Sequence, residues 1–266
     1  KNGFEVDIYE RYERYLNKEG HLKSGHPTFN REEIQILEYC CLISIGGDGT
    51  LLDTVTLIGD SGVPVIGLNA GRLGFISSVS LDELDIVLDS LQDDNYKVDK
   101  RSLIQVETER EVYGKHNFGL NEVTIHKKDT ASMIKIESFV NEEYLNTYWA
   151  DGLIVSTPTG STAYSLSCGG PIIVPGSENF VITPIAPHNL NVRPVVVSNN
   201  VRLKLKAEGR SDDFLIAIDS RPEIIYPKEE IHISKAPFSI NLLCPEGHTF
   251  LTTMRNKLAW GFDKRN

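Results

Sequence analysis

The sequence lacks the residue patterns that mark several common classes of protein. Its 266 residues include only four cysteines, at positions 40, 41, 168 and 244, and no two of them form a C-x-x-C pair. The seven histidines show no i,i+4 spacing and no pairing with the cysteines. A disulfide framework and a structural zinc site both need such patterns. We therefore expect reduced, buried thiols and no structural metal site.

Basic charge is also in short supply. Lysine and arginine total 27 against 37 acidic residues, which gives a net charge of −10. Nucleic acids and anionic membranes bind concentrated basic surfaces, so this balance argues against both as partners. A phosphate ligand would have to be bound by backbone amides, a metal ion and a few local cations.

Long apolar runs are missing as well. No stretch approaches the ~18 consecutive apolar residues of a membrane helix, and no charged-then-apolar leader opens the chain. We therefore expect a cytoplasmic protein. Apolar residues make up 40% of the sequence, which is enough for the core of one large or two ordinary domains.

The first hundred residues have the pattern of an α/β domain. Residues 40–45 and 63–68 are continuously apolar, and residues 51–58 between them suit a helix. Strands of this kind are expected to lie parallel in a sheet that is covered on both faces. Ser80, followed by Glu83, predicts the start of another helix, over residues 81–92.

The segment before these elements is less regular. Residues 3–9 predict a strand that reads as the second strand of its sheet, with its first strand missing. The polar residues 10–31 contain Gly20, Gly25 and Pro27, which predict a mobile connection leading to a helical turn over residues 31–37.

The second half is expected to be β-rich. From residue 101 onward, apolar and polar residues alternate with the period of two that half-buried strands show. This alternation predicts a stacked-sheet domain, with turns at Glu208-Gly209 and Pro222. Its strands are expected over residues 104–109, 134–136, 201–207, 214–218, 231–233 and 240–243. Residues 249–260 return to a helical pattern.

The most informative run is Ile43-Ser44-Ile45-Gly46-Gly47-Asp48-Gly49-Thr50-Leu51-Leu52. Three glycines let the backbone approach a ligand closely, so that successive N–H groups can point at phosphate oxygens. A carboxylate among phosphates must hold a metal ion or accept a proton, although Asp-Gly is also a common turn dipeptide. The third glycine of the Rossmann fingerprint and the Gly-Lys-Ser/Thr of a Walker loop are both absent.

This run resembles the GGDGT signature shared by NAD kinases, by diacylglycerol and sphingosine-type lipid kinases and, more loosely, by phosphofructokinases. A second string narrows the choice: Asp151-Gly152-Leu153, then Ser156-Thr157-Pro158-Thr159-Gly160-Ser161-Thr162-Ala163-Tyr164-Ser165, then Gly169-Gly170-Pro171. It is similar to the long dinucleotide-binding motif of NAD kinases, and Asn121-Glu122 matches the short Asn-Glu motif of that family. The resemblance covers nearly the whole chain, from about Phe4 to Gly261.

The resemblance implies a two-domain fold. An α/β domain with a parallel sheet, residues 1–97 plus about 245–266, would carry GGDGT and bind the phosphate donor. A β-rich stacked-sheet domain, residues 98–244, would bind the dinucleotide. The C-terminal helix would return to the first domain.

The resemblance also implies a reaction, the phosphorylation of the 2′-hydroxyl of the adenosine ribose of NAD to give NADP. Asp48 would be the general base, and Gly47, Gly49 and Thr50 would lie against the donor phosphates. ATP or polyphosphate would be the donor, and a divalent cation, Mg²⁺ in the first place, would be required. The family suggests a homo-oligomer, a dimer or a tetramer.

Further residues are matched to the family one by one. Asn121 and Glu122 would bind the adenine edge and a ribose or metal, although a polar pair that starts a strand is the simpler interpretation. Asp151 would contact the nicotinamide side. The surface against adenine and ribose would be formed by Thr162, Ala163, Tyr164 and Ser167.

Four further residues match family positions, and for the first three a simpler explanation without ligand contact also exists. Leu52 and Phe75 would flank the adenosine, yet both would also serve as core residues. Arg72 is a candidate cation for the donor phosphates, yet exposed arginines are usually just solvated. Asp219 matches a family acid near the dinucleotide.

Two positions depart from the family. Ser220 stands where some members have histidine, and Trp149 stands where others have a cation. The charge pattern on the substrate side is therefore expected to differ.

Other functions stay open on the sequence. A diacylglycerol-type lipid kinase would share the GGDGT run but would not be expected to carry Asn121-Glu122 with residues 157–167. A non-catalytic dinucleotide sensor would not need the Asp48 carboxylate. An oxidoreductase should show the complete glycine fingerprint with an acid ~20 residues further on, where this chain has Asn69.

Overall fold

The parallel strand pair near the N-terminus is confirmed. The computed structural model describes residues 3–22, 25–35, 38–71, 74–128 and 132–260. In it, β3 (Leu42–Gly46) and β4 (Val65–Asn69) pair in parallel, and α2 (Asp48–Ile58) connects them. The helix buries Leu51, Val55 and Ile58 against this sheet, because apolar residues on one helical face must find an apolar surface. β5 (Val79–Ser80) adds a short parallel strand beside β4.

The β-rich half consists of two packed sheets, as predicted. One sheet has the order β13-β12-β11-β8-β15-β16. The second contributes β10-β9-β14-β17, with β6 and β7 paired beside them. Apolar residues from both sheets form one core cluster, which includes Val123, Phe214, Ile136 and Leu205.

The strands of these two sheets have the following bounds: β6 (Tyr96–Thr108), β7 (Phe118–Gly119), β8 (Glu122–Lys127), β9 (Ile134–Val140), β10 (Glu143–Ala150), β11 (Gly152–Ser156), β12 (Asn179–Ile185), β13 (Val195–Ser198), β14 (Leu203–Glu208), β15 (Phe214–Ile218), β16 (Arg221–Ile225) and β17 (Glu230–Pro245). Short helical segments are η1 (Glu33–Gln35), η2 (Leu81–Glu83), η3 (Gly114–His116), η4 (Gly160–Thr162) and α4 (Tyr164–Ser167).

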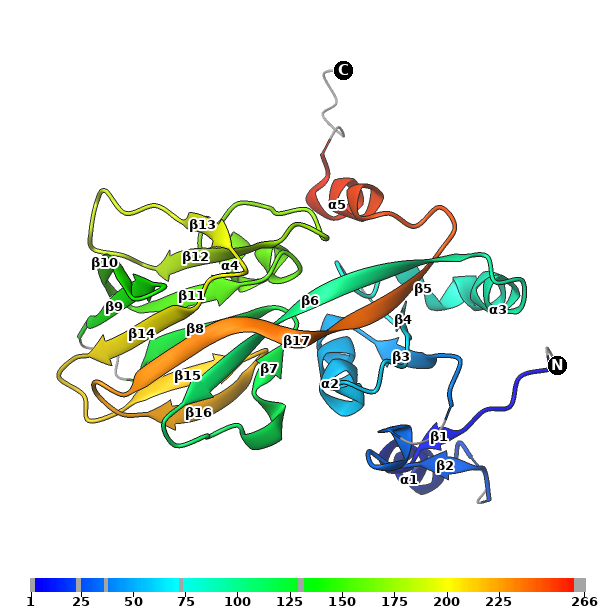
Figure 1. Ribbon diagram of the computed structural model, residues 1–266. Coiled ribbons are helices and arrows are strands. Elements are labelled where there is room, and N and C mark those ends of the chain that lie inside the picture. The colour runs from blue at the N-terminus through cyan, green and yellow to red at the C-terminus, as the bar shows by residue number, and fades with distance from the viewer. Residues whose placement is uncertain (1–2, 23–24, 36–37, 72–73, 129–131, 261–266) are drawn as a thin grey trace.

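Two long strands join the halves. β6 and β17 pair antiparallel from Thr108 opposite Ile231 to Tyr96 opposite Pro245, with a bulge between Lys235 and Ser239. β17 also pairs in parallel with β4, so that one sheet runs from the β-rich half into the α/β half (Figure 1). The predicted domain boundary at residue 97 falls inside β6 and stays a prediction.

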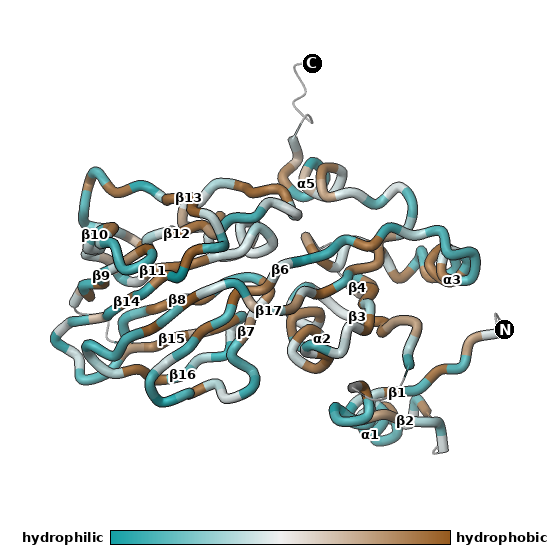
Figure 2. The backbone as a smooth tube through the Cα atoms, in the orientation of Figure 1, coloured by the Kyte–Doolittle hydropathy of each residue, from teal (hydrophilic) through white to brown (hydrophobic). Residues whose placement is uncertain are grey.

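The N-terminal segment differs from its prediction. Residues 10–31 were expected to form a mobile connection, but they contain α1 (Glu10–Lys18), flanked by β1 (Ile8–Tyr9) and β2 (Thr28–Phe29). α1 buries none of its residues and is largely hydrophilic in Figure 2. Tyr12, Tyr15 and Leu16 give α1 a helical i, i+3, i+4 spacing, but the many polar residues, the two glycines and the proline of residues 10–31 favoured a connection in the sequence analysis.

The helices at the other end of the α/β half follow their predictions closely. Ser80 and Glu83 form the predicted capping box, which starts η2 and leads into α3 (Leu84–Gln92). Near the C-terminus, α5 (Phe250–Leu258) begins after Thr249, whose side chain accepts a hydrogen bond from the Thr252 amide.

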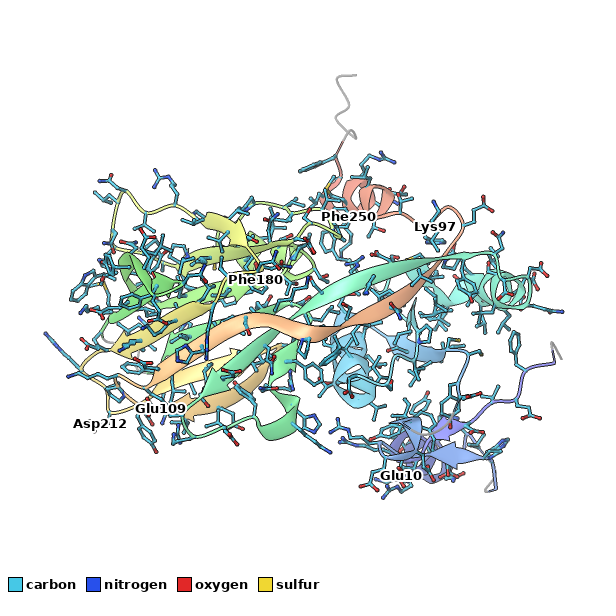
Figure 3. The ribbon with its side chains drawn as sticks, in the orientation of Figure 1. Glu10, Lys97, Glu109, Phe180, Asp212 and Phe250 are labelled. Carbon is cyan, nitrogen blue, oxygen red and sulfur yellow. The ribbon has the colours of Figure 1, made fainter. Side chains whose placement is uncertain are left out.

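α5 lies over the loop that carries Phe75. The Lys257 ammonium stands 5.4 Å from the centre of the Phe75 ring. A cavity of about 300 Å³ lies between this loop, α5 and the ends of β6 and β17. Lys97 and Phe250, both labelled in Figure 3, line it from β6 and from α5.

Three smaller points complete the fold. The thiols are free, but Cys40 is exposed and the other three are half-buried, so the expectation of buried thiols was wrong. Pro222 lies within β16 and not in a turn; an edge strand tolerates proline because it has no partner on one side. None of the helices in the described ranges is long and apolar enough to cross a membrane.

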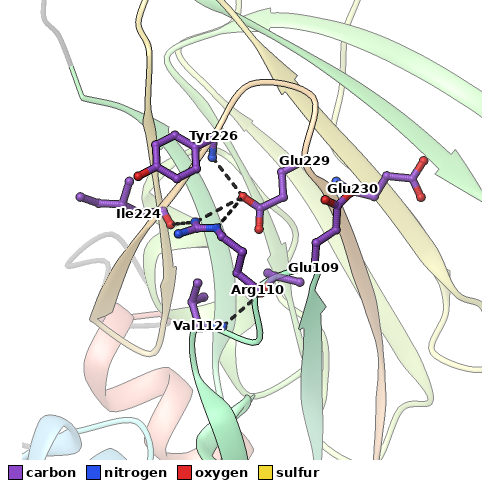
Figure 4. Close-up of polar contacts among 8 residues, drawn as sticks. Glu109, Arg110, Val112, Ile224, Tyr226, Glu229 and Glu230 are labelled. Carbon is purple, nitrogen blue, oxygen red and sulfur yellow. Dashed lines mark hydrogen bonds and ion pairs between the residues drawn. The ribbon is translucent and has the colours of Figure 1, made fainter.

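A buried carboxylate secures the far end of the β-rich half (Figure 4). Glu229 has a side chain only 5% exposed, and one of its oxygens accepts hydrogen bonds from the Arg110 guanidinium and the Tyr226 amide. Arg110 also donates to the carbonyl of Ile224 and stacks over the Tyr226 ring, 4.5 Å from its centre. The arginine therefore ties the β16–β17 connection to the end of β6.

Candidate functional site

Asp48 is held by a cradle of backbone amides. It is the first residue of α2, directly after the strand β3. One oxygen accepts a hydrogen bond from the Phe75 amide at 2.8 Å, and the other accepts from the amides of Ile76 at 3.2 Å and Ser77 at 2.9 Å. A carboxylate has about four acceptor positions, so the three donors found among the described residues fix it and leave one position open.

Gly74 makes this cradle possible. A Cβ atom at position 74 would lie 1.9 Å from the Asp48 Oδ1. No side chain could keep that distance, so the loop approaches the carboxylate only because residue 74 is glycine. The sequence pattern gave no direct sign of this contact.

The glycines around Asp48 leave the N-terminus of α2 open. In the described part of the chain, no side chain caps this end of the helix, and built Cβ atoms at Gly47 and Gly49 meet nothing within 4 Å. Thr50 is exposed beside them. The first amides of a helix are unpaired and carry partial positive charge, which suits an anion. The three residues predicted to face donor phosphates therefore lie at an uncapped helix start.

Asn121 and Glu122 form a second held turn, at the start of β8. The Asp219 carboxylate accepts hydrogen bonds from the amides of Leu120 at 2.5 Å, Asn121 at 2.9 Å and Glu122 at 3.1 Å. The side chain of Asn121 is buried, and its Oδ1 finds no hydrogen-bond partner among the residues that the structure describes. Since buried polar atoms are nearly always paired, the Asn121 Oδ1 is a candidate for a ligand contact.

Glu122 has an unusual electrostatic environment. Burial, followed by the nearby Asp219 carboxylate, raises the pKa of Glu122 to about 8. Its Oε2 is buried and has no hydrogen-bond partner within the described ranges. Burial likewise raises the pKa of Asp219, while the three amides and the Arg221 guanidinium oppose that rise. Perturbed carboxyls of this kind gather at functional sites.

The uncharged loop of residues 156–163 lies directly on the Asn121 turn. The Thr157 amide donates to the Asn121 carbonyl at 2.8 Å, and the Thr157 hydroxyl donates to the Leu120 carbonyl at 2.5 Å. A Cβ atom at Gly160 would lie 2.1 Å from the Asn121 carbonyl oxygen, so only glycine permits this approach. The two motifs, far apart in the sequence, therefore form one surface.

The other residues predicted to contact adenine and ribose differ in how deeply they are buried. Thr162 is 9% exposed and donates its hydroxyl to the Thr159 carbonyl at 3.1 Å. Tyr164 is exposed, and burial of its hydroxyl, with the charges of Cys168, Asp151 and Glu122, raises the pKa of its phenol. Tyr164 thus faces the two carboxylates predicted to contact the dinucleotide. Ala163 is half-buried next to it, whereas Ser167 is exposed at the end of α4.

Two ion pairs that the sequence motifs did not predict involve residues of the site. Asp151 pairs with Lys127 at 2.5 Å, which adds a cation to the predicted nicotinamide side. Arg101 is 7% exposed and donates to the Thr159 hydroxyl at 3.1 Å and to Asp99 at 2.6 Å. Because β6 carries Arg101 between the halves, this contact fixes the dinucleotide loop to the shared sheet.

α2 brings the Asp48 and Asn121 regions to the same interface. Leu51 of α2, Phe118 and Leu120 belong to one apolar cluster. The Asp53 carboxylate, also on α2, lies close enough to Arg221 to oppose the lowering of its pKa by burial. Leu52 is half-buried against this cluster, and Phe75 lies in the Asp48 cradle. Arg72 lies outside the described residues, and its predicted role is not addressed by the fold.

Comparisons with known sequences point in one direction. The model of the ATP-NAD kinase N-terminal domain matches residues 18–96, and that of the ATP-NAD kinase C-terminal domain matches residues 120–244. A protein of Flavobacterium psychrophilum named NAD kinase is 45% identical over 268 residues, which cover 100% of this chain and 91% of the relative. A Bacteroides fragilis protein of the same name is 40% identical over 265 residues, with the same shares covered.

Solved structures support the fold. A yeast NADH kinase complexed with NADH matches with a TM-score of 0.85 at 22% identity, over 97% of this chain and 79% of that chain. An NAD kinase from Archaeoglobus fulgidus in complex with ATP matches with a TM-score of 0.71 at 24% identity, over 94% and 92% of the two chains. At these identities the likeness shows the two-domain architecture alone.

Proposed function

The chain belongs to the NAD kinase family, and we propose that it transfers a phosphoryl group to the 2′-hydroxyl of the adenosine ribose of NAD, giving NADP. The observation that carries this proposal is the placement of Asp48. Its carboxylate is fixed by three amides, stands beside an uncapped helix start, and lies on the interface that also holds the Asn121 turn. Matches to both family models favour this function over a lipid kinase or a non-catalytic sensor.

Asp48 is the proposed general base. The one acceptor position that the amides leave open would take the proton from the ribose 2′-hydroxyl as its oxygen bonds to the terminal phosphorus of the donor. The bond from that phosphorus to the bridging anhydride oxygen would break, and this oxygen would leave with the shortened donor, ADP in the case of ATP. Because three donors hold the carboxylate still, little reorganisation would be needed for this step. The amides of Gly47, Gly49 and Thr50 would meanwhile bind oxygens of the donor phosphates.

The dinucleotide would bind across the second held turn. Asn121 has a side-chain oxygen without a partner among the described residues, which could accept a hydrogen bond from the adenine amino group, and Glu122 has a similarly unpaired oxygen that could meet a ribose hydroxyl. Tyr164 would pack against the adenine and ribose, together with Thr162, Ala163 and Ser167. Asp151, with its Lys127 partner, would contact the nicotinamide side. Leu52 and Phe75 would flank the adenosine.

The donor would be ATP or polyphosphate, together with a divalent cation. The described residues contain no group of three His, Cys, Asp or Glu that could hold a metal on their own. This fits Mg²⁺, which is usually held by one or two carboxylates plus the substrate phosphates. Such an ion would neutralise the charge of the transferring group.

Two features outside the chemistry are also proposed. The chain would assemble as a homodimer or homotetramer, since Trp149 is 47% exposed and Leu190 is 89% exposed in adjoining segments next to Asp151. Large exposed apolar side chains of this kind are typical of interfaces. The protein would work in the cytoplasm.

The proposal is tested by a coupled assay. Purified protein, NAD and Mg²⁺ are incubated with ATP or with polyphosphate, and NADP is detected through an NADP-specific dehydrogenase. Asp48→Asn should fold normally and lose ~10²–10⁴-fold in kcat, since an amide cannot accept the proton. Asp53→Asn, on the same helix and exposed, should stay near wild type. Absence of NADP with either donor, while NAD still binds, would overturn the kinase and favour the sensor.

A further inference from the structure

The tip of the β15–β16 hairpin holds the segment that leads into the Asn121 turn from two sides. Asp219 accepts hydrogen bonds from three successive amides, those of Leu120, Asn121 and Glu122. Its own amide donates back to the Glu122 carbonyl at 3.1 Å. From the same tip, Arg221 donates to the carbonyls of His116, at 2.8 Å, and of Phe118. Two side chains of one hairpin, Asp219 and Arg221, therefore make five hydrogen bonds to the backbone of this segment.

The turn of the hairpin that carries Asp219 has an unfavourable backbone conformation. Ile218 pairs with Arg221, so the turn has two residues, and both lie in the left-handed region, with φ of 45° at Asp219 and 65° at Ser220. Such turns favour Asn, Asp and above all Gly. Gly119 completes the fit, because a Cβ atom there would lie 2.5 Å from the Ile218 side chain and 3.0 Å from the Asp219 carboxyl.

We propose that Asp219 is a positioning residue, which holds the backbone of Asn121 and Glu122 in the conformation that binds the dinucleotide and does not itself contact the ligand. Asp219 is only 7% exposed, and three of its acceptor positions are filled by the amides. Its nearness to the dinucleotide, expected from the family, arises through the turn that it holds. This inference rests on the proposed function.

The same carboxylate sets the charge environment of Glu122. The groups that face Glu122 are Asp219 from the hairpin tip and Tyr164 from α4, and Arg221 faces Asp219 in turn. Burial first, and the Asp219 charge second, raise the pKa of Glu122 to about 8. Removing the negative charge of Asp219 should therefore lower the pKa of Glu122. A purely structural role would not produce this change.

The test compares Asp219→Asn with the wild type. An amide keeps the shape of the carboxyl but turns an N–H group toward one of the three donors. The KM and the Kd for NAD, the latter by calorimetry, should rise about tenfold or more, with kcat within about threefold. The inflection in the pH dependence of the Kd should move to lower pH. Hydrogen exchange at the amides of residues 120–122 should become faster.

Two matched variants serve as controls. Asp213→Asn makes the same change at the other end of β15, where Asp213 pairs with Lys128 at the surface, and should leave all four readouts unchanged. Ser220→Gly relaxes the left-handed turn and keeps Asp219, and should also leave them unchanged. If Ser220→Gly raises the Kd as much as Asp219→Asn does, the turn shape and not the carboxylate positions the site, and the proposal fails.

The remaining outcomes are equally decisive. Unchanged Kd and exchange in Asp219→Asn would overturn the proposal, as would a fall in kcat without a change in KM. If this variant does not fold, exchange in the wild type decides: slow exchange at the three amides supports the proposal, and exchange at the rate of a free loop overturns it. Because binding and exchange need no turnover, they remain informative even if the kinase assay is negative.

Discussion

Two aspartates of this protein are held in nearly the same way at different depths. Asp48 accepts hydrogen bonds from the amides of Phe75, Ile76 and Ser77, and Asp219 accepts them from Leu120, Asn121 and Glu122. In both cases the three amides follow a glycine: a Cβ atom at Gly74 would lie 1.9 Å from the Asp48 Oδ1, and one at Gly119 would lie 2.5 Å from Ile218 and 3.0 Å from the Asp219 carboxyl. Asp48 is half-buried, whereas Asp219 is only 7% exposed.

The difference shows that a carboxylate held by three backbone amides can have either of two roles. A fixed carboxylate that still reaches the solvent can act on a ligand, and we assign that task to Asp48. A fixed carboxylate that is closed off can only shape the chain around it, and Asp219 is assigned that task. Exposure, and not the number of hydrogen bonds, separates the two roles.

The strongest way to break the comparison is to open the Asp48 cradle from the loop side. Gly74→Ala would place a methyl group 1.9 Å from the Asp48 Oδ1, so the loop or the carboxylate must move. We expect kcat to fall about 10²-fold, because misplacement of a catalytic group by about 1 Å has an effect of that size. Gly71→Ala, where a Cβ meets nothing within 4 Å, is the matched control. Equal activity of the two variants would show that the cradle does not position the base.

A milder test loosens the dinucleotide loop instead. Thr159→Val removes the hydroxyl that accepts a hydrogen bond from Arg101 at 3.1 Å and leaves a buried guanidinium less well paired. The KM for NAD should rise about three- to tenfold, with kcat little changed, because one buried charged hydrogen bond is lost. Thr159→Ser keeps the hydroxyl and should restore the wild-type KM. Steady-state kinetics that show the same KM for Val and Ser would exclude a role of the Arg101 contact.

The raised pKa of Glu122, which lies beside Asp219, can be tested through the pH dependence of the protein's stability. The pKa of Glu122 rises on folding from 4.5 to about 8. The folded state therefore binds this proton more tightly than the unfolded state, and the stabilisation it gives is lost as the pH rises from about 5 through 8. Glu122→Gln removes the titrating group.

The melting temperature of Glu122→Gln, measured by calorimetry relative to wild type, should therefore increase between pH 5 and pH 8. The gain should amount to several degrees, since each pKa unit corresponds to about 1.4 kcal/mol. Glu143→Gln, an exposed glutamate on β10, is the control and should show a constant difference. A difference that is also constant for Glu122→Gln would mean that this carboxyl titrates normally.

The smallest expected effect concerns a carboxylate that lies outside both cradles. Arg110→Met leaves the buried Glu229 without its cation and should lower the free energy of unfolding by about 1–3 kcal/mol. The kcat and KM should not change, because this contact lies beside Glu109, at the end of the β-rich half that is away from α2 (Figure 3). Arg202→Met removes a pair whose two side chains are each 55% exposed, and should cost less than about 1 kcal/mol in urea unfolding. Equal costs would show that burial of Glu229 does not matter.

Much of the fold could be predicted from the sequence because burial leaves a periodic record. The apolar runs of β3 and β4, the capping box of Ser80 and Glu83, and the alternating strands of the β-rich half all appear where their patterns placed them. α1 was missed because its helical spacing is limited to Tyr12, Tyr15 and Leu16, none of them buried, within a polar segment that contains turn residues.

The site likewise contains residues that could be predicted from local sequence and contacts that could not. Motifs identified Asp48, Asn121 and Glu122, because glycine-rich turns and family strings are local in the sequence. The contacts that hold these residues are not local: 97 to 99 positions separate Asp219 from its three amides, and 58 separate Arg101 from Thr159. Such partners depend on which strands meet, and a single sequence without a fold does not contain that information.

The pairing of β17 with β4 affects how the protein can be made. On the edge of β4 that faces away from β3, β5 pairs with Leu68 and Asn69, but the Val65 end gains its partner only when residues 230–245 arrive, more than 160 residues after β4 itself. During synthesis on the ribosome, that end of the β4 edge therefore stays unpaired while most of the chain is still being translated. Unpaired strand edges invite association with other chains. A truncation before residue 230 should accordingly leave an aggregating N-terminal fragment, not an independently folded domain.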